Sequence, residues 1–249
     1  MSIDPPINRL KRALRGGDVQ IGLWSCLASP VAADVVGGSG FDWILLDTEH
    51  APNDVVAHRD GSYWFTDPPY GRSLYEGQPE PRELPTAVYR VDKSGAIARV
   101  VTEQQVPDPN GLAFSPDFTR LYVVSTGKGP GDTGPGGRGN MFVFDVGTDN
   151  TASNGRVFAD YMIDGVKCSP DGVRCDVDGN LWCSSNAGRA VGYSGVTVWT
   201  PQGKLIGRIR LPEVCANLCF GGPKRNRLFM AASQSLYSVY VNTEGAAPG

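Results

Sequence analysis

The sequence predicts a mainly β protein, an incomplete β-propeller of about four blades over residues 52–249, preceded by a short α/β segment over residues 1–51. Four times a Pro or Ala precedes an Asn or Asp, and an aromatic residue follows 11 or 12 positions later. The aromatic residues lie 47 to 60 positions apart, and such self-similarity in units of strands and turns is typical of propeller blades. The four openings are Pro52-Asn53-Asp54, Pro109-Asn110-Gly111, Pro170-Asp171-Gly172 and Ala216-Asn217-Leu218, and the aromatic residues are Trp64, Tyr122, Trp182 and Phe229.

The first 51 residues have a different pattern. Residues 8–15 are basic and helix-prone, and residues 19–24 form a strand-like run. Ser29 followed by Pro30 is typical of a helix start, and the helix that we expect there ends at Gly37. Residues 41–46 are a continuous apolar run, suited to a strand buried on both faces. This order predicts a β-α-β unit, the beginning of a parallel sheet.

From residue 55 onward the sequence alternates short β-rich runs with Gly-containing turns. Three pairs of runs predict hairpins, and no helix is predicted in this part. The Gly- and Pro-rich residues 127–139 predict a mobile loop over one face. The three hairpins join residues 86–91 with 97–101, 141–145 with 156–159, and 196–199 with 205–209.

The bulk composition excludes several classes of protein. The net charge is −3 without a long basic run, so nucleic acid is not an expected partner. No stretch approaches the ~20 apolar residues of a membrane span, and residues 1–15 lack the apolar core of a signal peptide. The six cysteines form no Cys-x-x-Cys pair, and we expect small buried thiols in a reducing compartment. These features predict a cytoplasmic protein that contacts no membrane.

Four stretches carry a resemblance to a known family: PNDVVAHRDGSYWFTDPPYG, DPNGLAFSPDFTRLYV, SPDGVRCDVDGNLWCSS and CANLCFGG. They resemble the senescence-marker-protein/gluconolactonase/luciferin-regenerating-enzyme family, six-bladed propellers that hydrolyse sugar lactones. The resemblance covers residues from about 52 to the end and supplies four blades of the six. It lacks the N-terminal portion of the family pattern, including the glutamate of the first blade.

A second resemblance covers residues 8–55, NRLKRALRGGDVQIGLWSCLASPVAADVVGGSGFDWILLDTEHAPNDV. They are similar to the opening of class II aldolases of the HpcH/HpaI type, which are metal-dependent TIM barrels. Asp47 and His50 match that family's pair for proton abstraction, but the fragment holds about two strands of eight and lacks the later metal ligands. We therefore expect no aldolase activity. Both families share the string Pro-Asn-Asp-Val, and the sequence resembles a fusion made at residues 52–55.

The resemblance to the lactone hydrolases implies a divalent cation in a central pocket, usually calcium, with zinc, manganese and magnesium as alternatives. Its implied ligands here are Asn110 and Asp171, and oxygen donors of this kind suit a hard cation. Asp171 is also the implied catalytic proton acceptor, and its two roles are not separable from the sequence. The implied substrate-binding residues are Asn53, Tyr70, Asn186 and Asn217. Asp47, Glu49 and Asp54 are candidates to replace the absent glutamate.

The leading functional hypothesis is a metal-dependent hydrolase of sugar lactones or related esters, with the cation polarising the carbonyl and activating water. One alternative is a propeller remnant that acts as an interaction scaffold, in which Asn-Gly and Asp-Gly are turn residues alone. Another is a recombination product without a selected role. An open propeller exposes an edge of its first blade, so we also expect a tendency to form homo-oligomers there.

Overall fold

A computed structural model of the chain describes residues 9–25, 42–46, 54–69, 84–127, 139–188 and 190–246. The chain divides into two compact units, Met1–Ala51 and Pro52–Gly249, and each is considered by itself.

The first unit contains one helix and two strands: α1 (Arg9–Gly16), β1 (Gly22–Ser25) and β2 (Trp43–Leu46). The helix consists mostly of Leu, Arg, Lys and Ala, which favour helices, and it ends where Gly17 adopts a positive φ of 79°. β1 and β2 pair in parallel, as expected for the β-α-β unit. The helix predicted after Pro30 lies outside the described residues.

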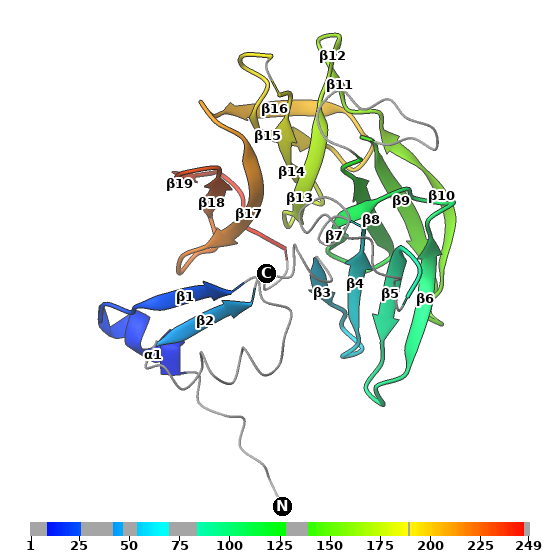
Figure 1. The fold of residues 1–249 in the computed structure, drawn as a ribbon, viewed down its shortest axis with the longest axis horizontal. Coiled ribbons are helices and arrows are strands. Elements are labelled where there is room, and N and C mark those ends of the chain that lie inside the picture. Colours follow the sequence, from blue (N-terminus) through cyan, green and yellow to red (C-terminus); the bar gives the residue numbers. More distant parts are fainter. Residues whose placement is uncertain are drawn as a thin grey trace, which may run out of the picture. The chain divides into compact units, whose positions relative to one another are not determined.

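The second unit is a series of four antiparallel sheets arranged as propeller blades (Figure 1), which confirms the predicted fold class. The predicted hairpins are all present, as β5–β6, β9–β10 and β15–β16. No helix occurs among the described residues of this unit. The first blade is β3 (Val55–Ala57), β4 (Tyr63–Asp67), β5 (Ala87–Val91) and β6 (Ile97–Thr102), and the second is β7 (Pro109–Phe114), β8 (Arg120–Ser125), β9 (Met141–Val146) and β10 (Ala152–Ala159). The third is β13 (Ser169–Cys175), β14 (Leu181–Asn186), β15 (Gly195–Trp199) and β16 (Leu205–Arg210), and the last is β17 (Cys215–Gly221), β18 (Arg227–Ala232) and β19 (Leu236–Tyr240). A two-stranded hairpin, β11 (Met162–Ile163) and β12 (Val166–Lys167), separates the second blade from the third.

The innermost strands of successive blades lie beside one another, because β7 contacts both β3 and β13, and β13 contacts β17. All six residues of β7 are buried. The residues that open the second, third and fourth sequence repeats therefore lie at the beginnings of inner strands, around one axis.

The apolar core lies between successive blades and is built from the repeated aromatic positions. Trp64 packs with Leu112 and Phe114 between the first two blades, and Tyr122 packs with residues of the third blade. Trp182 packs with residues of the last blade. These three side chains are nine-tenths or more buried. Phe229, the fourth aromatic position, is partly exposed and lies under the guanidinium of Arg227, 5.0 Å from its ring centre.

Of the six cysteines, Cys26 lies outside the described residues, and the other five follow the expectation of buried thiols with one exception. Cys168, Cys175, Cys183 and Cys215 are buried and free, and burial raises the pKa of the last three to about 12. Cys219 is exposed, so the expectation was wrong there, because this residue of β17 lies in the last blade, which no further described blade covers. No helix described in the structure has the length and apolar character needed to cross a membrane.

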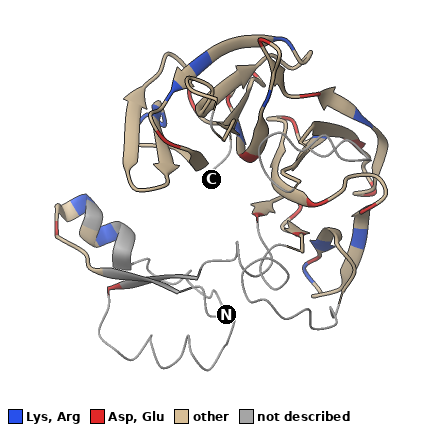
Figure 2. Cartoon of the chain, turned by 45° about the horizontal axis from the view of Figure 1, so that its top comes forward, with Lys and Arg blue, Asp and Glu red and all other residues tan. Residues whose placement is uncertain are grey.

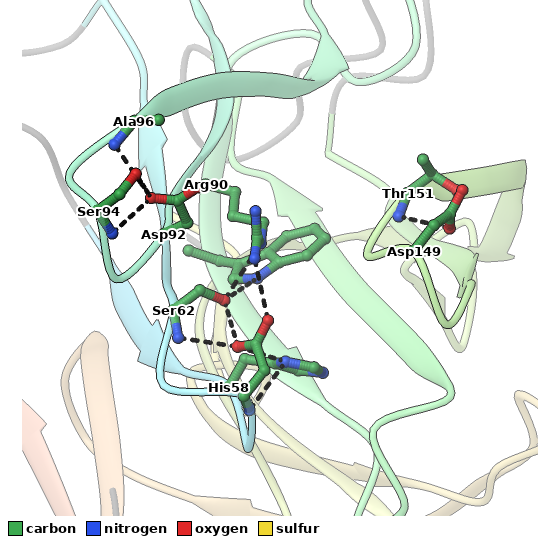
Figure 3. A network of polar contacts seen from close by, with 10 residues as sticks. His58, Ser62, Arg90, Asp92, Ser94, Ala96, Asp149 and Thr151 are labelled. Atoms are coloured by element: carbon green, nitrogen blue, oxygen red, sulfur yellow. Dashed lines mark hydrogen bonds and ion pairs between the residues drawn. The ribbon is translucent and has the colours of Figure 1, made fainter.

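A polar network closes the turn between β3 and β4 (Figure 3). The Asp60 carboxylate accepts hydrogen bonds from the Ser62 backbone N–H and hydroxyl at 2.8 and 2.6 Å, and from Arg90 Nη2 at 3.0 Å. His58 Nδ1 lies 2.9 Å from the same carboxylate, and the Trp64 indole donates to the Ser62 hydroxyl at 3.2 Å. The turn is thereby tied to the core tryptophan. Burial raises the pKa of Asp60, but the bonds from Ser62, His58 and Arg90 outweigh it and hold that pKa well below its usual range.

We expect Asp60→Asn to lower the free energy of unfolding by about 1–2 kcal/mol at pH 7, because a neutral amide cannot accept the same charge-assisted bonds. Since the folded-state pKa is depressed, this contribution is present above the unfolded value of 3.8 and is lost as the pH falls through the lower folded value. Denaturant unfolding of the two proteins at pH 7 and at about pH 3 measures both effects.

Asp149→Asn is the matched control. Asp149 accepts the same two bonds from Thr151 in an exposed hairpin turn, without an arginine or an indole in the network (Figure 3). Its effect at pH 7 should be clearly smaller. An equal effect of the two substitutions would show that the bonds of Asp60 to Arg90 and His58 add nothing to the turn.

Candidate functional site

Two side chains that the sequence singled out meet at the beginnings of the inner strands. Asn110 of β7 donates from Nδ2 to Oδ1 of Asp171, in β13, at 2.7 Å. The same nitrogen donates to the Thr126 hydroxyl at 2.8 Å. The Asn110 side chain is buried, with 6% of the residue exposed. Its two hydrogen-bond partners come from the second and third blades and hold the amide in one orientation. Residues 61 positions apart in the sequence therefore form one polar pair.

Thr126 and Ser169 join the second and third blades around this pair. The Thr126 hydroxyl donates to the Pro170 carbonyl at 2.7 Å, and the Ser169 hydroxyl donates to the Thr126 carbonyl at 2.8 Å. Sequence reasoning missed Thr126. No local sequence pattern singles it out, because its place beside Asn110 follows from the pairing of Ser125, the last residue of β8, with Pro109.

In the second and third repeats, the glycine after the opening Asn or Asp permits this close approach. A Cβ on Gly111 would lie 2.1 Å from the backbone oxygen of Asp171. A Cβ on Gly172 would lie 2.3 Å from Oδ1 of Asn217. The Asn-Gly and Asp-Gly pairs therefore let three inner strands pack edge against edge, in addition to any role in a turn.

Asp54 lies next to Asn217 in the same unit. Its Oδ2 is buried without a hydrogen-bond partner and lies 3.8 Å from Nη1 of Arg174. Burial raises the pKa of Asp54, and Arg174, the Leu112 backbone N–H and the Asn217 side chain offset part of this rise. The interactions described for Asp54 do not include Asn110 or Asp171, so its use as a replacement ligand stays a hypothesis.

Asn217 and Asn186, two other predicted site residues, form hydrogen bonds with nearby backbone groups. Asn217 begins the inner strand of the last blade, and its Oδ1 accepts from the Leu218 N–H at 2.8 Å. Asn186 ends β14, opposite Ser169, and its Oδ1 accepts from the Gly188 N–H at 2.9 Å. The remaining candidates lie outside the described residues: Asn53, Tyr70, Asp47, Glu49 and His50.

A cavity of about 260 Å³ lies at the opposite ends of the same inner strands. Phe114 of β7 and Arg174 of β13 line it, together with Val55, Phe118 and Phe220, whereas Asn110 and Asp171 do not. The lining is mostly apolar and holds no carboxylate. The polar pair, and not this cavity, is therefore the candidate reaction centre.

The donor atoms at the polar pair suit an oxygen-preferring cation. The hydrogen bonds described for the Asn110 side chain use its nitrogen. The amide oxygen is therefore a candidate metal ligand, together with the Asp171 carboxylate. Within the described part of the chain, no three side chains from His, Cys, Asp and Glu gather into a cluster. The pair thus fits calcium, magnesium or manganese by donor type better than zinc, and further oxygen ligands are needed to complete a shell.

Comparison with known proteins identifies the family. The model of the SMP-30/Gluconolactonase/LRE-like region matches residues 31–234. The chain belongs to this family. A gluconolactonase from Zymomonas mobilis is 28% identical to this family member over 202 residues, which are 79% of the chain and 52% of that protein. A solved structure of a gluconolactonase from Xanthomonas campestris has a TM-score of 0.61 and 33% identity, over 76% of the chain and 56% of that protein.

This member of the SMP-30/gluconolactonase/LRE-like family spans about half the length of the curated gluconolactonase that it matches. A hydroxypyruvate/pyruvate aldolase from Deinococcus radiodurans is 58% identical over 55 residues, which are 22% of this chain and 20% of the aldolase. The family assignment rests on the propeller part, and the aldolase likeness is confined to a short segment.

We expect Gly111→Ala to destabilise the protein by about 1–3 kcal/mol, because the new methyl group meets a backbone oxygen that cannot rotate away. Gly207→Ala in β16 is the control, since its Cβ would lie 3.7 Å from Val198 in ordinary contact. Denaturant unfolding of both variants measures the effect. Equal stability of the two would contradict close packing of β7 against β13.

We expect Asp54→Asn to raise the melting temperature at pH 7 by about 2 °C or more, because the amide avoids burial of a charge. Because the folded-state pKa of Asp54 is raised, the wild-type protein has its full stability at pH values below the unfolded pKa of 3.8. It loses that stability as the pH rises through the folded-state pKa of Asp54. The gain in melting temperature of Asp54→Asn over the wild type should therefore vanish near pH 4. Thermal melts at both pH values test this.

Asp92→Asn provides a control of opposite sign. Hydrogen bonds from Ser94 lower the pKa of Asp92 in an exposed turn, so its loss should not stabilise the protein at pH 7. If Asp54→Asn also melts lower at pH 7, the attraction to Arg174 outweighs the burial of the Asp54 carboxylate.

Proposed function

We propose that the protein hydrolyses sugar lactones or related esters with the help of a divalent cation, for which calcium is the first candidate. The observation that carries the proposal is the buried Asn110–Asp171 pair, 2.7 Å apart at the starts of two inner strands. The family assignment supports the lactone or ester as the class of substrate. Calcium accepts six to eight oxygen ligands in flexible geometry, which suits a site with few protein donors.

Asn110 and Asp171 would hold the cation through the amide oxygen and the carboxylate. When bound, a divalent cation polarises the substrate carbonyl and increases the acidity of water beside it. Asn110 also donates to Asp171, and Thr126 fixes the Asn110 nitrogen, so the carboxylate is oriented before substrate arrives.

Asp171 is the proposed proton acceptor in the reaction. It takes a proton from the attacking water as the water oxygen bonds to the lactone carbonyl carbon. The bond from that carbon to the ring oxygen then breaks, and the departing ring oxygen takes up the proton held by Asp171, so that the carboxylate is restored and lactone and water become one hydroxy acid. Asn217 and Asn186, with Asn53 and Tyr70, are the proposed contacts to the sugar hydroxyls.

We expect calcium, magnesium or manganese, added to a chelated sample, to switch on hydrolysis of gluconolactone or of a simple aryl ester, with zinc less effective. Asp171→Ala should reduce the metal-stimulated rate by roughly 100-fold or more, equivalent to about 2.7 kcal/mol of transition-state stabilisation. Asn110→Ala should have a similar effect, since it removes a ligand and also the 2.7 Å hydrogen bond that orients the Asp171 carboxylate. A pH-stat assay of lactone opening with each variant measures this.

Asp145→Asn is the matched control, because its exposed carboxylate contacts Asn154 and Arg156 on the outside of the second blade. Its metal-stimulated rate should equal that of the wild type. Unchanged turnover in Asp171→Ala would exclude the proposed centre. No turnover in the wild type, together with a melting temperature insensitive to divalent ions, would favour the scaffold alternative.

A further inference from the structure

Thr126 links the two strands that carry the proposed cation ligands. Its hydroxyl accepts a hydrogen bond from Asn110 Nδ2 at 2.8 Å and donates one to the Pro170 carbonyl at 2.7 Å. Its own carbonyl accepts from the Ser169 hydroxyl at 2.8 Å. Because Pro170 directly precedes Asp171, Thr126 is bonded to the side chain of one proposed ligand and to the backbone beside the other.

The bonds of the Thr126 hydroxyl can run in one direction only. A hydroxyl group has a single hydrogen, and the Pro170 carbonyl, which can only accept, takes it. The hydroxyl oxygen is then left as an acceptor, so the Asn110 amide must present its nitrogen to it. A reversed amide would place two acceptors against each other at a buried residue, which costs free energy. Thr126 therefore determines which end of the Asn110 amide faces it.

The amide nitrogen of Asn110 uses both of its hydrogens in this arrangement, one to Thr126 and one to Asp171. The bond to Asp171 also requires the nitrogen, but that carboxylate is itself a proposed ligand, and a bound cation competes with Asn110 for its charge. In the bond between Asn110 Nδ2 and the Thr126 hydroxyl, neither atom is a proposed ligand. This bond therefore keeps the amide oxygen available to the cation both before and after the cation binds.

We propose that Thr126 is a positioning residue that sets the affinity of the Asn110–Asp171 pair for a divalent cation. This role rests on the proposed function, since it requires the cation to bind at this pair. Thr126 is not one of the proposed ligands and acts through the orientation of the Asn110 amide. Groups that orient metal ligands in this way typically change metal affinity by about 10- to 100-fold when they are removed.

The same hydroxyl also ties the second blade to the third through Pro170. If this link were its whole role, its removal would lower cation affinity whichever atoms residue 110 presents. The orientation role instead requires a side chain with two different ends, nitrogen and oxygen. Asn110→Asp separates the two roles, because both ends of an ionised carboxylate are oxygen.

Calcium titration of the full chain by isothermal titration calorimetry, after treatment with a chelator, tests the proposal. Thr126→Val keeps the shape of the side chain and removes the hydroxyl, and it should raise the calcium dissociation constant about 10-fold or more. Thr126→Ser keeps the hydroxyl and should bind calcium as tightly as the wild type. Thermal melts without calcium show whether each variant is folded, and Thr126→Ala provides a second form of the test if Thr126→Val is not.

Thr119→Val is the matched control. It removes a hydroxyl that donates to Asp117 at 2.8 Å in an exposed turn, and it should leave calcium affinity unchanged. None of the substitutions at Thr126 and Thr119 changes the charge of the chain. The distribution of Lys, Arg, Asp and Glu that Figure 2 shows is therefore common to all these proteins and does not contribute to a difference between them.

The decisive comparison repeats Thr126→Val in the Asn110→Asp protein. Its effect on the calcium dissociation constant should be clearly smaller there, because either oxygen of the new carboxylate can serve as the ligand. The added charge is present in both proteins of this second pair, so it cancels from the comparison.

Wild-type calcium binding that Thr126→Val leaves unchanged would overturn the positioning role and leave the proposed cation site in place. An equal loss of affinity in the Asn110 and Asn110→Asp proteins would also overturn it, since Thr126 would then act only by tying the blades together. Failure of the wild type to bind calcium would overturn the proposed function and the positioning role together.

Discussion

The close approach of the inner strands β7 and β13 is the constraint on which the candidate site depends. Gly111 lies so near the Asp171 backbone that a Cβ would come within 2.1 Å of its oxygen. This proximity permits the 2.7 Å bond from Asn110 to Asp171. Gly172 and Asn217 repeat the arrangement one blade further on. Packing around the axis and the polar chemistry at its end are therefore consequences of the same glycines.

The polar ends and the apolar ends of the inner strands have separate roles. Asn110 and Asp171 begin their strands, whereas Phe114 and Arg174 end them and line the cavity. A buried carboxylate, Asp54, lies among these strands beside Arg174, with its pKa raised by burial. Arg174 offsets the burial of this charge only in part, which is an energetic cost that an apolar core position would not have.

Most of the fold could be predicted because its signals are local. Gly-containing turns between β-rich runs predicted the hairpins, and Trp64, Tyr122 and Trp182 are buried at the repeat spacing. Phe229 and Cys219 have the same kinds of signal but are less buried, since both lie in the last blade, which no further described blade covers. The roles of Asn110 and Asp171 as metal ligands stay a prediction, as do those of Asn53 and Tyr70, which lie outside the described residues.

The sequence by itself determined the blade repeat, the turns and the residue types at the start of each inner strand, because these follow from local spacing and turn chemistry. Only the tertiary structure decided which of those residues meet. Asn110 and Asp171 are 61 positions apart and become partners through strand packing, with Thr126 as a third member that local patterns do not single out.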